Sequence, residues 1–88
     1  MSPELETLDQ LLGGALPLAV IQNIYPDLEA LRLGVFGLLT SGDVCLLAID
    51  NTDVPSWRWR ELFVDGSAMK ELGNMRLKIT AQGARRIA

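Results

Sequence analysis

The sequence predicts an α+β fold with three N-terminal helices, two strands separated by a long insert, and a short C-terminal helix. Three observations support this class. A helical pattern over residues 28–41 ends at Gly42 and passes directly into the apolar run 44–49, which has the length of a strand. Residues 76–79 alternate polar and apolar, as a half-buried strand does. Thr80 follows at an N-cap position, so a helix is expected to begin there.

The first helix is expected to begin at Ser2-Pro3-Glu4. This tripeptide supplies a capping side chain, a proline suited to the first helical position, and a carboxylate near the positive end of the helix dipole. A leucine stripe follows at helical spacing, and the glycine pair at residues 13–14 ends the helix. The leucines of this stripe are Leu5, Leu8 and Leu12.

A second helix is predicted from Pro17 to about Tyr25. Pro26 ends it, because the residue before a proline is pushed out of the α region. Its inward side chains are expected to be Leu16, Val20, Ile21 and Ile24.

A third helix is predicted from residue 28 to about residue 41. Asp27 precedes it with a side chain that can cap it, and Gly42 closes it. Its apolar positions recur at helical spacing, so they are expected to face the core. They are Leu28, Leu31, Val35, Leu38 and Leu39.

The insert between the two strands covers about residues 50–74. Residues 56–64 alternate well enough for a strand, but Pro55-Ser56 is equally suited to open a helix, so both structures remain open. Asp65-Gly66 is expected to turn the chain, and residues 67–72 are predicted to form one or two helical turns ending at Gly73-Asn74.

Residues 38–47 and 75–87 resemble the winged helix-turn-helix superfamily. In such domains the third helix ends in a Leu-Leu-x-x-Gly-x-Val pattern and enters the wing directly, and the last wing strand runs into a C-terminal helix. Here Leu38 to Val44 carry the first pattern, and Thr80-x-x-Gly83 opens the last helix. The resemblance implies a single winged-helix-like domain over residues 1–88, with a two-stranded wing. It implies binding to DNA or to proteins, since winged helices serve both purposes.

The third helix departs from the pattern of a DNA-reading helix. Its outward positions carry an acid and apolar side chains, and Arg32 is its only base. Gly34 and Gly37 each cost roughly 1 kcal/mol in a helix interior, and glycines there usually permit another backbone to approach closely. This helix therefore resembles an interface, with Leu33 and Phe36 on its outer side.

Composition favours assembly. A chain of 88 residues has room for one core, yet hydrophobic residues make up 49% of it, and with its eight glycines this exceeds the share usual for soluble domains. Part of the apolar surface is expected to be covered by a partner, most simply a second copy of the chain. A homo-oligomer or a protein partner is therefore predicted.

Charge is divided unevenly between the two halves of the chain. Residues 1–53 carry eight acids and one base, whereas residues 54–88 carry seven bases and three acids. The acidic half opposes nucleic-acid binding, while the basic half allows weak contacts with a DNA backbone. An equally open alternative is that the two halves neutralise each other in the fold.

The sequence offers little to an enzyme. It contains no histidine, the commonest near-neutral base and metal ligand, and Cys45 lies in an apolar run, where a thiol is usually inert. No nucleophile–base pair, calcium loop or phosphate-binding glycine motif is recognisable. We expect no catalytic residues, no cofactor and no metal. With neither a leader peptide nor a membrane span in the sequence, the expected location is the cytoplasm.

Two functions are therefore expected. The first is a non-enzymatic DNA-binding regulator of transcription, and the alternative is a protein-interaction or assembly module that does not bind DNA. The run 57–60 is central to both, because tryptophan and arginine stack on bases and also dominate protein interfaces; a plainer reading is that one tryptophan anchors the insert to the core. The nucleic-acid candidates are Arg58, Arg60, Arg76 and Lys78. The protein-interface candidates are Leu33, Phe36, Trp57 and Trp59.

Overall fold

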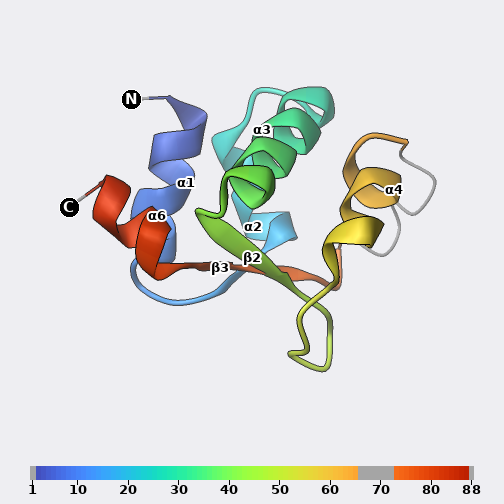
Figure 1. Cartoon of the computed structure of the whole chain (residues 1–88). Coiled ribbons are helices and arrows are strands. Elements are labelled where there is room, and N and C mark those ends of the chain that lie inside the picture. Colours follow the sequence, from blue (N-terminus) through green and yellow to red (C-terminus); the bar gives the residue numbers. More distant parts are fainter. Residues whose placement is uncertain (1, 66–72, 88) are drawn as a thin grey trace.

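A computed structural model describes residues 2–65 and 73–87 of the chain (Figure 1). The α+β class is confirmed: helices pack on one face of a three-stranded antiparallel sheet. The strand order is β1 (Leu16–Pro17), β3 (Arg76–Ile79), β2 (Val44–Leu47). The central strand β3 therefore pairs with both edge strands, and its Leu77 lies between Leu16 and Leu46.

The helices follow the predicted order, and the first and third of them have the predicted caps. Ser2 Oγ accepts a hydrogen bond from the Leu5 amide at 3.3 Å, and Asp27 Oδ1 accepts one from the Ala30 amide at 2.8 Å. Gly42 ends the third helix in the left-handed conformation, with φ of 86°. The described helices are α1 (Pro3–Leu11), α2 (Leu18–Ile21), 3-10 helix η1 (Gln22–Ile24), α3 (Leu28–Ser41), 3-10 helix η2 (Ser56–Arg58), α4 (Trp59–Phe63) and α6 (Ala81–Arg86).

The predicted second helix and the two-stranded sheet were both wrong in part. Leu16–Pro17 is strand β1, and the helix begins only at Leu18. Pro17 has no amide hydrogen to donate, which an edge strand tolerates, and the Leu18 amide bonds the Met75 carbonyl at 3.0 Å instead. This later start rotates the inward face, so Leu18 is buried with Ile21, while Val20 is 41% exposed.

The predicted core stripe of α3 is confirmed except at its first residue. Leu28 is 47% exposed rather than buried. It lies in the first turn, and Figure 1 shows the start of α3 farther from the sheet than its end. The other stripe residues, Leu31, Val35, Leu38 and Leu39, are buried.

Residues 56–63 of the insert are helical, which decides between the two alternatives for residues 56–64. Leu62 and Phe63 of α4 are fully buried, so the insert contributes to the common core. Trp59 packs against this core and donates from its ring nitrogen to the Val54 carbonyl at 3.1 Å. The helical turns predicted at residues 67–72, and Gly66 before them, lie outside the described residues. Among the described helices, none has both the length and the apolar character needed to cross a bilayer.

Candidate functional site

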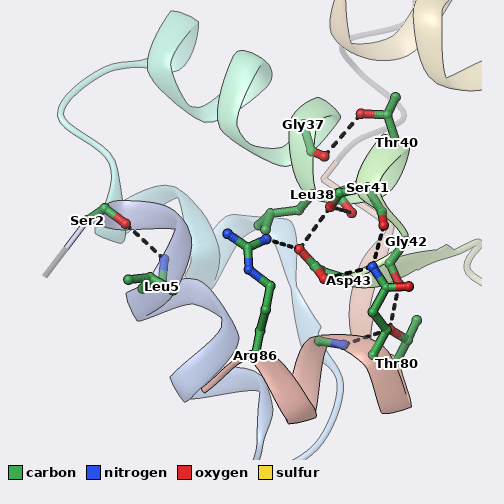
Figure 2. Close-up of polar contacts among 12 residues, drawn as sticks. Ser2, Leu5, Gly37, Leu38, Thr40, Ser41, Gly42, Asp43, Thr80 and Arg86 are labelled. Carbon is green, nitrogen blue, oxygen red and sulfur yellow. Dashed lines mark hydrogen bonds and ion pairs between the residues drawn. The ribbon is translucent and has the colours of Figure 1, made fainter. Parts of the chain in front are cut away.

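Helix α6 is joined to the turn between α3 and β2 by Thr80 (Figure 2). Its hydroxyl accepts a hydrogen bond from the Gly83 amide at 3.1 Å, which confirms the predicted N-cap. The same hydroxyl donates to the Gly42 carbonyl at 2.6 Å, and the Thr80 amide donates to the Asp43 carbonyl at 3.0 Å. One residue therefore starts the last helix and ties it to a turn almost forty positions earlier in the chain.

Asp43 is a fully buried carboxylate at this junction. Ser41 Oγ donates to it at 2.8 Å, Gln82 Nε2 approaches at 3.4 Å, and the Arg86 guanidinium forms an ion pair with it (Figure 2). Gln82 also donates to the Ser41 carbonyl at 2.6 Å. This cluster, which sequence reasoning missed, satisfies the buried carboxylate, so we interpret it as structural. No local pattern could have found it, because its members lie in two distant segments.

Arg32, the only base on α3, points at the end of α4 rather than at solvent. Its Nε donates to the Phe63 carbonyl at 2.9 Å, and its Nη2 donates to the Val64 carbonyl at 3.1 Å. These are carbonyls that the end of a short helix leaves without intrahelical partners, and the negative end of a helix favours a cation. The one cation of α3 is thus used to hold the insert against it.

The outward face of α3 that remains is apolar and acidic. Leu33 is 60% exposed, and Glu29 and Thr40 are exposed on the same side. Phe36 is partly buried, because its ring packs against the core. This outer face is therefore uncharged apart from one carboxylate.

The two glycines of α3 have different roles. A Cβ on Gly34 would lie 2.5 Å from a ring carbon of Tyr25, so the missing side chain makes room for that ring. The prediction that Gly34 admits another chain was therefore wrong, because its own chain fills the space. A Cβ on Gly37 would have nothing within 4 Å, so this glycine meets no neighbour within the described chain.

The two tryptophans of the insert are also separated. Trp59 is the core anchor described above, whereas Trp57 in η2 is 75% exposed. Of the two candidate interface tryptophans, Trp57 is thus the one presented to solvent.

The four basic candidates fall into two groups on different elements. Arg58 forms an ion pair with Glu61 at 3.3 Å, and Arg60 is exposed on α4. Arg76 and Lys78 alternate along β3 with the buried Leu77, so both project from the outward face of the sheet. Within residues 2–65 and 73–87, neither of these two side chains makes a hydrogen bond or an ion pair.

A groove of about 860 Å³ runs along that outward face. It lies between the end of α1 with the turn after it, the β2–β3 pair, and the turn that follows β2. Leu12, Cys45, Leu47, Asp53, Arg76 and Lys78 are among its lining residues. We call it the sheet groove.

Cys45 in the sheet groove is a poor thiolate. Burial raises the pKa of its thiol above the ordinary value, and the negative charge of Asp53 raises that pKa further, whereas Lys78 acts in the opposite direction. The thiol therefore stays protonated at neutral pH and serves as a small half-buried apolar group. In the part of the chain that the structure describes, no three histidine, cysteine or acidic residues gather in a group that could hold a metal ion.

Three surfaces thus stand out among the described residues: the outer face of α3, the exposed Trp57, and the sheet groove, whose two cations have no hydrogen-bond or ion-pair partner in that part of the chain. Comparisons with models of known protein families, with curated proteins and with solved structures find no match for this chain.

Proposed function

We propose that this chain is a winged-helix-like binding module. Three connections support the assignment: α3 passes through Gly42 directly into β2, β2 pairs antiparallel with β3, and β3 passes directly into the Thr80-capped α6. These are the connections that the resemblance implies for the third helix, the wing and the last helix. Helix α4, packed beside α3, is an addition to that plan.

The module assembles through proteins rather than by reading bases with α3. The observation that carries this proposal is the position of Arg32, whose guanidinium is held by the two carbonyls at the end of α4. A helix that reads bases in the major groove offers polar and basic side chains. The side chains left on the outer face of α3 include the exposed Leu33 and the carboxylate of Glu29, which a phosphate-lined groove disfavours.

Gly37 favours a second copy of the chain as the occupant of this face. A glycine in a helix interior costs roughly 1 kcal/mol relative to alanine, and nothing in its own described chain uses the space it leaves. Next to the exposed Leu33, that space lets a partner backbone approach closely. Two α3 helices crossing at Gly37 would cover Leu33 on both copies, in the self-complementary manner of a two-fold contact.

Leu33→Glu is expected to weaken this association by at least about a hundredfold. The substitution buries a carboxylate from each copy in the dimer interface without a cation to pair with it. Sedimentation equilibrium at micromolar concentration should show dimers of the 9.6 kDa parent chain and monomers of the variant. Ile49→Glu is the matched control, since Ile49 is 77% exposed and lies outside α3. Phe36→Glu is less suitable, since Phe36 also packs against the core.

Gly37→Ala sharpens the same test. In a single chain it should stabilise α3 by about 1 kcal/mol, because no atom opposes the new methyl group. In the dimer the added methyl group should weaken association, because it fills the space that the partner backbone would occupy. A variant that unfolds at higher urea and dissociates more easily supports the proposal. A parent chain that stays monomeric at high concentration contradicts it.

Weak contact with a DNA backbone is the second candidate function. The observation that favours it is that Arg76 and Lys78 project from one face of β3 without partners in the described chain. Two cations on a wing strand suit phosphates and carry no sequence information. Arg58 adds less to this surface, because Glu61 offsets its charge.

Binding to a mixed-sequence duplex is expected to be visible at ~50 mM salt and to weaken steeply as salt rises, with a slope of about −0.9 per neutralised phosphate. Arg76→Gln/Lys78→Gln should flatten the slope by about two such increments of 0.9, one for each phosphate contact that is lost. Fluorescence anisotropy at several salt concentrations measures this. Arg85→Gln, which removes an exposed base from α6, should leave the slope unchanged. Absence of binding at low salt would remove this candidate.

A further inference from the structure

We propose that the sheet groove binds a small amphipathic anion, one acidic group on an aliphatic body. The site is built by strand alternation. Leu77 points into the core, so its neighbours Arg76 and Lys78 point outward. Their cross-strand partners on β2, Leu47 and Cys45, lie on the same outward face. Cations and apolar groups therefore alternate over one surface of about four residues.

The charge of the groove favours an anion. Arg76 and Lys78 lie two residues apart on one strand, so their backbone positions are separated by roughly 7 Å. Both cations therefore lie along the same side of the groove. Asp53 is the acidic residue that lines the same groove, so its two bases are in excess of the acid. A carboxylate or phosphate entering between the bases gains charge-assisted hydrogen bonds that neither base makes within the described chain.

The apolar part of the groove favours a ligand that also has an aliphatic body. Leu12, at the end of α1, is 54% exposed and lines the groove with Leu47 and Cys45. Covering these apolar side chains is favourable when the ligand itself brings apolar atoms, because the water in contact with them is then displaced. The volume of about 860 Å³ is within the range of small-molecule sites, so an aliphatic body fits beside the acidic head.

A DNA backbone satisfies only half of this chemistry. Phosphates can reach the two bases, but a duplex brings no aliphatic group to cover Leu12 and Leu47. The small amphipathic anion satisfies both halves, so it is the ligand class that the groove favours. The proposal does not use α3, and it stands or falls independently of the assembly proposal.

Cys45 is a built-in reporter for this site, because it is the only cysteine of the chain and it lines the groove. Octanoate is expected to slow alkylation of Cys45 by neutral N-ethylmaleimide in a saturable manner. Octylammonium, which has the same body and the opposite charge, should not, and inorganic phosphate, which lacks the body, should not. Amide chemical shifts of residues 11–15, β2 and β3 should follow the octanoate titration with the same saturation.

The variant Arg76→Gln/Lys78→Gln is expected to weaken octanoate binding by about tenfold or more, since it removes both charge-assisted contacts. Arg85→Gln is the matched control and should bind as the parent chain does; circular dichroism confirms that both variants are folded. Three results would overturn the proposal: no protection by octanoate, equal protection by octylammonium or phosphate, or unchanged binding in the double variant. Protection by duplex DNA but not by octanoate would likewise overturn it and favour the backbone-contact candidate.

Discussion

Replacing Gly83 by alanine is expected to lower the free energy of unfolding by about 3 kcal/mol, the upper end of the cost of overpacking a tight contact. A Cβ at this position would lie 2.1 Å from the Asp43 carbonyl oxygen and 3.0 Å from a side-chain carbon of Ile79. The backbone oxygen cannot move aside, since it already accepts the Thr80 amide. Helix α6 must shift as a whole and lose contacts with the α3–β2 turn. Urea denaturation followed by circular dichroism measures the loss.

Gly13→Ala is the matched control for this substitution. A Cβ there would have the Gln10 carbonyl oxygen as its nearest neighbour, at the ordinary contact distance of 3.9 Å. Its effect should stay within about 1 kcal/mol and be neutral or stabilising. Equal stability of Gly83→Ala and the parent chain would show that α6 does not rest on the turn, and it would contradict the structure at this junction.

The Asp43–Arg86 ion pair is expected to give the second largest effect. Among the described residues, Arg86→Ala leaves Ser41 and Gln82 as the only side-chain donors to a fully buried carboxylate. Breaking a fully buried pair costs roughly 3–5 kcal/mol, but the Arg86 side chain is 51% exposed, so water screens part of the interaction. We expect a loss of about 2 kcal/mol in the free energy of unfolding.

A double-mutant cycle with Asp43→Ala separates the pair from its surroundings. Once the carboxylate is gone, removal of Arg86 should cost little, so the coupling energy should be about 1–2 kcal/mol. Arg85→Ala, one position away and exposed, should change stability by less than about 0.5 kcal/mol. Additive single effects would show that the ion pair contributes nothing to stability.

The sequence by itself determined the features that depend on a few neighbouring residues. The caps at Ser2, Asp27 and Thr80, and the helix end at Gly42, were predicted correctly, because capping needs only a side chain within three residues of the amide it satisfies. Periodicity over a long helix was equally informative, and it placed four of the five expected core residues of α3.

Tertiary structure alone decided the features that depend on distant partners. Leu16 and Pro17 form a strand only because β3 lies beside them. Residues 56–63 are helical because Leu62 and Phe63 must both reach the core, which a strand period would not allow.

The candidate sites were divided in the same way. Periodicity identified Leu33 as outward, and strand alternation identified Arg76 and Lys78 as neighbours on one face. The commitment of Arg32 to α4, and the filling of Gly34 by Tyr25, could not be predicted, since each joins segments whose separation in sequence carries no local signal. Those long-range contacts engage the one base of α3 and fill one of its two glycines, which leaves Leu33 and Gly37 on its outer face.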